Sequence, residues 1–278
     1  MANKGQFWSP PSGAYNAAVD MVDRNVSEGR GDKVAFIDPA TRLTYAQLQD
    51  RCDRFANALR ALGVRCEHRI VLIMTDTVDL PTAFWGAIKA GIVPIPLNTL
   101  LTEEQWTYMI EDSRADAVVV SAELMDRVGP VVAEVGKRRK LHVIVSGAAA
   151  QGQTSFAALL SASPAKAQAA DTRADEVAFW LYSSGSTGMP KGTRHLHASP
   201  MHTAKLVAGE ILNINESDVV FSAAKLFFAY GLGNGMSFPM SVGATAVLMP
   251  DRPTPDSVMG MMRAHNPTIF CGVPTLFA

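Results

Sequence analysis

The chain has 278 residues, of which 48% are apolar and 18% are charged, so it is long enough to bury one large core or two closely packed ones. Its formal net charge of −1 gives no electrostatic reason to expect nucleic acid or an anionic membrane as a partner. The three cysteines (Cys52, Cys66 and Cys271) form no CxxC pair, which argues against a disulfide framework and a zinc site and favours a reducing cytoplasm.

At the N-terminus a lysine is present but no apolar stretch follows it, so this segment lacks the pattern of a signal peptide. Farther along, no apolar run reaches the length of a membrane span, because Phe84–Leu97 is interrupted by one lysine and two prolines. We therefore expect a cytoplasmic protein with neither a membrane nor a nucleic acid among its partners.

Short runs rich in β-branched residues recur along the chain and predict strands. Because these runs are continuously apolar, they are typical of parallel sheets that helices cover on each side. The predicted strands are Lys33–Ile37, Arg69–Met74, Ala117–Val120, His142–Val145, Val177–Tyr182, Val219–Ser222, Thr245–Met249 and Thr268–Cys271.

Segments with helical spacing lie between the predicted strands. Thr44 and Gln47 form a capping box that opens a helix, and Gly63 is placed to end it. Thr102 and Gln105 repeat the capping box ahead of a second helix. Further helices are predicted at Asp79–Ala90, near Phe156–Leu160 and at Pro200–Glu210. This alternation predicts an α/β fold with helices on both faces of largely parallel sheets.

A change of composition suggests a division of the chain. Residues 147–174 are rich in Ala, Ser, Gly and Gln and show little periodicity. We interpret residues 151–174 as a surface connection between two packed α/β subdomains, which would span residues 1–150 and 175–278.

One stretch directly after a predicted strand carries the chemistry. Val177–Tyr182 runs straight into Ser183–Gly192, which holds four hydroxyls, three glycines and one lysine. Glycines let the backbone bend so that successive N–H groups point at one anion, and hydroxyls add further donors. Lys191 adds a positive charge that suits the oxygens of a polyphosphate.

Two other interpretations of this stretch are weaker. A plain flexible turn is the alternative, but the strand that leads into the loop and the lysine after proline favour phosphate binding. The order of Lys191 and Gly192 differs from the Walker A pattern, which disfavours an NTPase of that class.

Residues Tyr182–Gly192 resemble the phosphate-binding signature of the adenylate-forming superfamily, which includes acyl-CoA synthetases, peptide-synthetase adenylation domains and luciferases. Leu43–Leu48 and Gly86–Pro94 are similar to two further segments of that family, and we interpret both as fold markers without catalytic roles. The resemblance implies that the loop holds the β- and γ-phosphates of ATP, accompanied by Mg²⁺, with Lys191 and Thr187 as catalytic residues. The implied phosphate-binding set is Ser183, Ser184, Gly185, Ser186, Thr187, Gly188 and Lys191.

The segment Ser222–Asn234 lies where that family has its acyl pocket. By resemblance Phe228, Ala229 and Tyr230 line the pocket, whereas we interpret Phe227 as core. A slot of aromatic rings with one small residue suits an aryl acid better than a long alkyl chain. The wider pattern is similar to benzoate–CoA and hydroxybenzoate–CoA ligases, and the choice between benzoate, a hydroxybenzoate and an aminobenzoate stays open.

The resemblance implies a two-step reaction and a longer protein. A carboxylate would attack the α-phosphorus of ATP to give an acyl-adenylate, and coenzyme A would then take the acyl group as a thioester. Relative to the family pattern the chain stops early, at Ala278. We therefore expect a piece of a chain nearly twice as long, weak or inactive by itself, whose adenine, Mg²⁺ and coenzyme A contacts and small C-terminal domain lie beyond Ala278. A homodimer is a further expectation.

Other functions stay open at this point. The enzyme could adenylate an aliphatic or amino acid, or the chain could be a non-catalytic nucleotide-binding module. Gly231 and Gly233 imitate the start of the GxGxxG pattern of an NAD-binding dehydrogenase, but Met236 stands where the third glycine belongs. His195 and His197 alternate after the loop, and without a third ligand they favour a structural role over a metal site.

Overall fold

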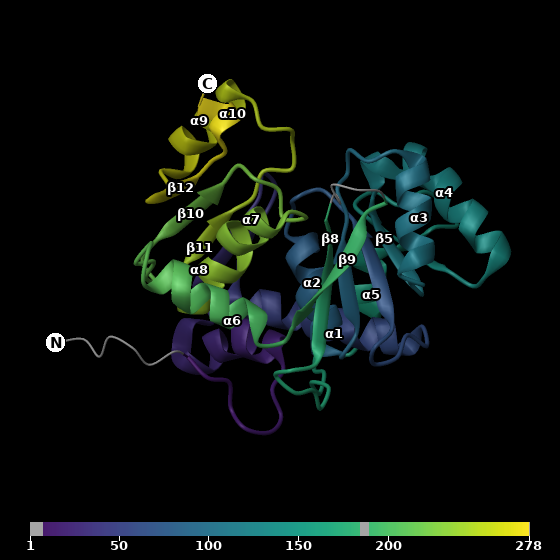
Figure 1. Cartoon of the computed structure of the whole chain (residues 1–278), viewed down its shortest axis with the longest axis horizontal. Helices are drawn as coiled ribbons and strands as arrows, with labels where there is room; N and C mark the ends of the chain where they lie inside the picture. The colour runs from purple at the N-terminus through teal and green to yellow at the C-terminus, as the bar shows by residue number, and fades with distance from the viewer. Residues whose placement is uncertain (1–7, 184–188, 278) are drawn as a thin grey trace.

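The computed structural model describes residues 8–183 and 189–277. Its strands form two five-stranded sheets and one two-stranded hairpin, and helices cover both faces of the sheets (Figure 1). This arrangement confirms the predicted α/β class with two largely parallel sheets. No helix in the described part of the chain is both long and apolar enough to cross a membrane.

The first sheet is parallel and has the strand order β4-β3-β5-β6-β7. Its strands are β3 (Arg69–Ile73), β4 (Val93–Pro96), β5 (Ala117–Ser121), β6 (His142–Ser146) and β7 (Thr154–Ser155). Successive side chains point to opposite faces. Ile70 and Leu72 join one core cluster, while Val71 and Ile73 join another. Burial on both faces explains why the runs are continuously apolar.

Helices supply the other half of each core cluster. The cluster of Ile70 and Leu72 is completed by α1 (Tyr45–Ala61), α2 (Asp79–Lys89) and α5 (Phe156–Ala162). The cluster of Val71 and Ile73 is completed by α3 (Glu103–Asp112) and α4 (Met125–Arg138). The first sheet is therefore sandwiched between two helical layers.

Both predicted capping boxes are present. The Gln47 N–H donates to Thr44 Oγ1 at 3.2 Å, and the Thr44 N–H donates to the Gln47 side chain at 2.9 Å. The same reciprocal pair joins Thr102 and Gln105 at the start of α3. Gly63 follows α1 with a φ of +84°, a left-handed conformation that suits glycine, so it ends the helix as predicted.

The second sheet has the order β12-β10-β11-β1-β2, with β2 antiparallel at its edge. Its strands are β1 (Val34–Ile37), β2 (Arg42–Thr44), β10 (Val219–Ser222), β11 (Thr245–Val247) and β12 (Ile269–Cys271). Because β1 pairs in parallel with β11, an early part of the chain completes a sheet that is otherwise built from residues 219–271. The sheets therefore cross the division at residues 151–174, and the subdomain boundaries stay a prediction.

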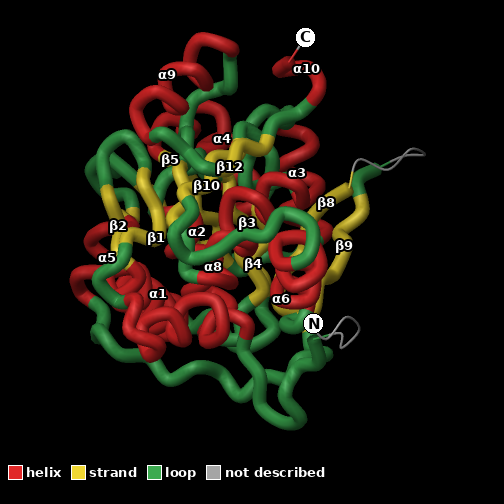
Figure 2. The backbone as a smooth tube through the Cα atoms, turned by 90° about the vertical axis from the view of Figure 1, so that its left-hand side faces the viewer, coloured by secondary structure: helices red, strands yellow, loops and turns green. Residues whose placement is uncertain are grey.

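Helices also lie on both faces of the second sheet (Figure 2). The remaining helical elements are η1 (Val19–Asp23), η2 (Val26–Arg30), η3 (Ala122–Leu124), α6 (Ser199–Thr203), η4 (Ala204–Gly209), α7 (Ala229–Leu232), η5 (Gly233–Ser237), α8 (Phe238–Val242), α9 (Pro255–His265) and α10 (Pro274–Phe277). On one face Val258 of α9 packs with Phe221, and on the other Phe238 of α8 packs with Val220. The continuous helical run of α6 and η4 confirms the helix predicted at Pro200–Glu210.

The strands β8 (Val177–Ser183) and β9 (Lys191–Leu196) form an antiparallel hairpin between the two sheets, with β8 alongside β4 (Figure 1). We predicted Val177–Tyr182 as a strand of a parallel sheet, and that pairing is wrong. The return from Ser183 to Lys191 is too short for a parallel crossover, which takes about a dozen residues or more. No strand is predicted at β9, because its residues are exposed or half-buried and lack an apolar run.

The predicted connection is fixed to the surface of α1. Arg54 donates to the Ser163 carbonyl oxygen at 2.9 Å, and Arg60 donates to that of Gln168 at 2.8 Å. Side chains of one helix thus hold residues 163–168 in place.

Candidate functional site

The predicted phosphate loop connects β8 to β9, so it begins and ends at the turn end of the hairpin. Ser183 and Lys191 are paired in the ladder, both are exposed, and the Ser183 hydroxyl lies 3.5 Å from the Lys191 carbonyl oxygen. We call these two residues the hairpin mouth. The other predicted loop residues lie outside the described residues, and their roles stay predictions: Ser184, Gly185, Ser186, Thr187 and Gly188.

Two aromatic side chains fix the hairpin mouth. The Tyr182 hydroxyl donates to a carboxylate oxygen of Asp112 at 2.6 Å, at the end of α3. Burial and this hydrogen bond both raise the pKa of Tyr182, so its hydroxyl keeps its proton at neutral pH. On the opposite strand, a Cβ at Gly192 would lie only 2.9 Å from the Trp180 ring. Glycine at this position therefore lets Trp180 cover the hairpin closely.

A cavity of about 310 Å³ opens beside the hairpin mouth. Its walls include Ser183 and Pro190 of the hairpin, the side chains of Gln105 and Met109 on α3, and the rings of Phe227 and Phe228. Phe227 is buried and packs edge-on against the half-exposed Phe228, with 4.7 Å between the ring centroids. Phe227 is buried but also lines this cavity, so its interpretation as core stays a prediction, and Phe228 reaches a cavity that Ser183 also borders.

The three residues of the predicted acyl pocket lie at the start of α7 and face different surroundings. Phe228 also borders a cavity of about 650 Å³, which Lys225 and residues 250–253 help to enclose. Ala229 lines a small cavity of about 130 Å³. Tyr230 is half exposed and its hydroxyl donates to the Gly272 carbonyl oxygen at 3.3 Å. Their role in acid binding stays a prediction.

The small cavity has a largely apolar lining and a volume close to that which holds one benzene ring. Phe179, Leu232 and Phe238 supply apolar walls. An apolar cavity of about 150 Å³ is large enough to hold benzene. His195 completes the wall and stacks on Phe179 with 4.6 Å between ring centroids. Because burial lowers the pKa of His195, its imidazole is neutral at pH 7.

His197 has the structural role that we predicted. It is buried, and its Nδ1 accepts a hydrogen bond from the Ala17 N–H at 3.1 Å. Burial lowers the pKa of His197 to about 4, so the imidazole stays neutral. Over residues 8–183 and 189–277, no three His, Cys, Asp or Glu side chains are grouped to hold a metal ion.

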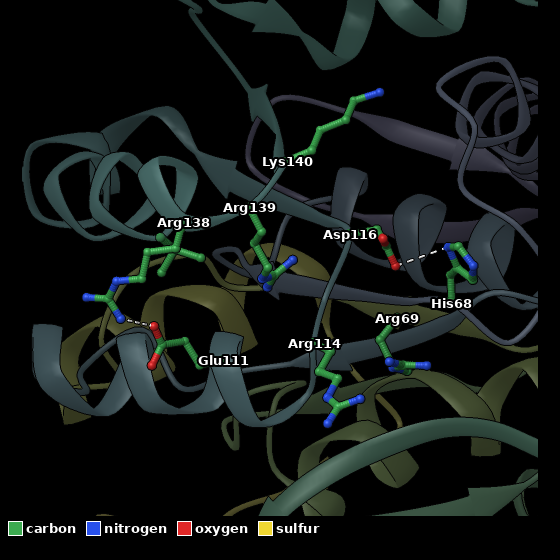
Figure 3. Close-up of a pocket in the computed structure, with 9 residues that line it drawn as sticks. His68, Arg69, Glu111, Arg114, Asp116, Arg138, Arg139 and Lys140 are labelled. Carbon is green, nitrogen blue, oxygen red and sulfur yellow. Dashed lines mark hydrogen bonds and ion pairs between the residues drawn. The ribbon is translucent and has the colours of Figure 1, made fainter.

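A fourth hollow, of about 590 Å³, is lined by basic side chains (Figure 3), and two of its arginines bind carbonyl oxygens of α3 and the residue after it. Arg69 donates to the Ser113 carbonyl oxygen at 2.8 Å, and Arg139 donates to that of Ile110 at 3.1 Å. These carbonyls belong to the last turn of α3 and the residue after it, where a helix leaves its carbonyl groups unpaired and its dipole is negative. The hollow is therefore explained as a helix cap.

The glycines at Gly231 and Gly233 do not form a dinucleotide-binding turn. Both lie inside the helical run of α7 and η5 rather than in the turn that follows β10. A Cβ at Gly231 would lie 2.0 Å from the Lys225 carbonyl oxygen, so glycine is required because α7 packs directly on the preceding turn. The interpretation as an NAD-binding dehydrogenase is therefore wrong, because its glycines would have to lie in the turn between a strand and a helix.

Two charged residues beside the site, the buried Asp76 and the half-buried Lys225, are missing from the sequence prediction. Asp76 lies three residues after the end of β3, at the carboxyl edge of a parallel sheet, which is where open α/β folds bind their ligands. That position is the one signal that could have identified it. Lys225 lies in the turn after β10 and has no signal of its own.

Comparisons with known proteins identify the family of the chain. A family model described as "AMP-binding enzyme" matches residues 22–278. The benzoate–CoA ligase of Thauera aromatica is 53% identical over 95% of this chain and 50% of its own length. The 4-hydroxybenzoate–CoA/benzoate–CoA ligase of Rhodopseudomonas palustris is 52% identical over 95% of this chain and 48% of its own length.

Among solved structures, that of a benzoate CoA ligase from Burkholderia xenovorans has a TM-score of 0.87 and 48% sequence identity. The alignment covers 95% of this chain and 51% of that one. The chain thus spans about half the length of the curated relatives that it matches.

Proposed function

Because this chain belongs to the family of AMP-binding enzymes, we propose that the protein joins an aromatic acid of the benzoate type to coenzyme A through an acyl-adenylate. The relatives at 53% and 52% identity are ligases of benzoate and 4-hydroxybenzoate, which supports this choice of acid.

The observation that carries the proposal is the arrangement around Phe228 and Ala229. Ser183 of the hairpin mouth borders the same cavity as Phe228. The next residue, Ala229, lines a cavity of the size of one aromatic ring. A ring site and a phosphate site are therefore separated by one short segment, as a reaction between an aryl carboxylate and ATP requires.

The proposed reaction has two steps. In the first, a carboxylate oxygen of the acid attacks the α-phosphorus of ATP. A new P–O bond forms as the bond to the β-phosphate breaks, giving the acyl-adenylate and pyrophosphate. In the second, the sulfur of coenzyme A attacks the acyl carbon, the bond to the AMP oxygen breaks, and the thiol proton is lost. The products are the thioester and AMP.

The loop takes part in the first step by holding the leaving pyrophosphate. Hydroxyls and backbone N–H groups are donors to its oxygens, and the Lys191 ammonium stabilises the negative charge that grows on them. The donor residues of the proposal are Ser183, Ser184, Gly185, Ser186, Thr187 and Gly188.

Mg²⁺ in this proposal binds the phosphate oxygens of ATP, the ligands with which such sites usually hold it. Among residues 8–183 and 189–277, no group of three acidic, histidine or cysteine side chains fits a protein cage for the ion. We therefore assign no step to a metal held by these residues. The three free cysteines suit a reducing compartment, which supports a location in the cytoplasm.

Acid-dependent exchange of pyrophosphate into ATP tests the first step. Lys191→Ala is expected to reduce exchange about 10²–10³-fold, the usual loss when one preorganised charge or donor is removed from a developing anion. Adding Gly188→Val, which obstructs the backbone N–H groups, should nearly abolish it. The assay uses the protein at its full natural length with benzoate, 4-hydroxybenzoate, 2-aminobenzoate and octanoate.

Lys205→Ala, at an exposed position of η4, is the matched control and should exchange like the wild type. Wild-type exchange by the Lys191→Ala variant would contradict the role of the loop. A preference for octanoate would contradict the aryl acid, and binding of ATP without exchange for any acid would favour a non-catalytic nucleotide-binding module.

A further inference from the structure

A buried carboxylate and a half-buried lysine hold the turn that leads to the acyl-pocket residues. This turn, residues 223–228, connects β10 to α7. Asp76 is 4% exposed, and its two carboxylate oxygens lie 3.3 and 3.4 Å from the Leu226 nitrogen. The Lys225 ammonium donates to three carbonyl oxygens after β11: Asp251 at 2.6 Å, Pro250 at 3.2 Å, and Met249.

These contacts connect the turn to both sheets. Asp76 stands at the carboxyl end of β3 in the first sheet, whereas residues 249–251 follow β11 in the second. The Phe228 N–H donates back to the Lys225 carbonyl oxygen at 3.0 Å, and Gly231 of α7 packs against the same oxygen. A displacement of Lys225 would therefore move both Phe228 and α7.

Burying these two charges costs free energy. Burial raises the pKa of Asp76 to about 6, although the Lys225 charge and the Leu226 N–H partly oppose it. Burial also lowers the pKa of Lys225, against the charges of Asp76 and Asp251. Asp76 and Lys225 hold the turn through separate hydrogen bonds, one to the Leu226 N–H and the others to carbonyl oxygens after β11.

We propose that Asp76 and Lys225 are positioning residues for the aromatic acid, because they set where Phe228 and Ala229 stand relative to the hairpin mouth. The inference rests on the proposed function, and neither residue is assigned a contact with the reacting atoms. Asp76 acts through the Leu226 N–H, and Lys225 acts through the carbonyl oxygens after β11. A displacement of about 1 Å in such a site can cost about 10²-fold in rate.

Three variants test the pair. Asp76→Leu removes the carboxylate that accepts from the Leu226 N–H and keeps a side chain of similar size. Lys225→Met keeps the aliphatic part of the side chain and removes the ammonium group that donates to the carbonyl oxygens after β11. Both are expected to raise the KM for benzoate about tenfold or more, because each leaves a buried polar group unpaired. The KM for ATP should change less than about twofold, since the phosphate loop is untouched. Asp76→Asn keeps an acceptor oxygen and should stay within about threefold of the wild-type KM for benzoate.

Asp171→Asn and Lys205→Met, both at exposed positions, are the matched controls and should leave both KM values unchanged. An equal rise of the two KM values, or no rise in Asp76→Leu and Lys225→Met, would overturn the proposal. So would an Asp76→Asn variant as impaired as Asp76→Leu. If Asp76→Leu does not fold, the KM values of Lys225→Met and Asp76→Asn for benzoate and ATP test the proposal instead.

A wild-type protein without acid-dependent exchange would refute the proposed function instead. In that case hydrogen exchange of the Leu226 amide still tests the anchoring by Asp76. It is expected to be about tenfold faster in Asp76→Leu than in Asp76→Asn, because only the latter keeps a partner for that N–H. Equal protection in the two variants would remove the basis of the inference.

Discussion

The carboxyl group of Asp76 is buried, and burial disfavours its charged form. Its pKa is about 6 in the folded protein against an ordinary value of 3.8, so the folded state holds this proton more tightly than the unfolded chain. The stability that this group contributes is complete below pH 3.8 and is lost as the pH rises through about 6. The whole change amounts to about 3 kcal/mol, since each tenfold in proton affinity corresponds to about 1.4 kcal/mol.

The wild type and Asp76→Asn should therefore diverge with pH. Between about pH 4 and about pH 8, the free energy of unfolding is expected to fall by up to about 3 kcal/mol more in the wild type, because only the wild type ionises this group. Urea titrations of both proteins measure the difference, in which all shared ionisations cancel. A difference that stays flat over this range would contradict the raised pKa.

At the scale of single residues, the sequence predicts the phosphate loop but not the contact between Asp76 and Leu226. The residues of Tyr182–Gly192 are consecutive, so their common purpose is visible in local composition. Asp76 and Leu226 are 150 positions apart, and a single aspartate after a strand has many ordinary uses. Only the tertiary fold identifies its partner.

Among the elements, α2 is joined to its neighbours by a buried lysine. Lys89 Nζ lies 2.8 Å from Asp23 Oδ2 of η1 and also pairs with Asp53 of α1. Burial opposes the charge of Lys89, but its hydrogen bonds to the two carboxylates outweigh burial and raise its pKa. Three elements thus depend on one ammonium group.

Lys89→Met should lower the free energy of unfolding by about 3–5 kcal/mol, because it leaves two partly buried carboxylates without their cation. Chemical denaturation measures the loss. Lys137→Met is the matched control, since Lys137 pairs with Glu134 on the exposed side of α4, where ion pairs contribute little. Equal effects of the two substitutions would show that the buried group does not hold the elements together.

Local signals predict the helices better than they predict strand partners. The caps of Thr44 and Thr102 span three positions, so both members of each hydrogen-bonded pair are visible in the sequence. The partner of β8 depends instead on the connection from Ser183 to Lys191, which is short enough to favour an antiparallel hairpin. The apolar pattern of a strand carries no information about that length. Apolar runs identify buried strands, and the half-exposed β9 gives none.

Over the whole molecule, the second sheet depends on both parts of the chain. Phe36 of β1 is opposite Ala246 of β11, so a piece made of residues 175–278 would lack β1 and β2. We expect that piece to be largely unfolded by itself, because β11 would lose its neighbour and leave an apolar edge unpaired. Adding the piece 1–174 should restore the circular dichroism of a folded α/β protein. Cooperative unfolding of residues 175–278 alone would instead support the predicted subdomain boundary.

The pairing of Phe36 with Ala246 also has a consequence for how the protein is made. β2 is made directly after β1 and covers one of its edges, but the ribosome must add about 210 residues before β11, the partner of the other edge, exists. At about 5–20 residues per second this delay lasts roughly 10–40 s. During that time an apolar strand is available to chaperones or to other nascent chains. Codons that slow translation between the two strands should therefore lower the folded yield in a foreign host more than codons placed after Ala246.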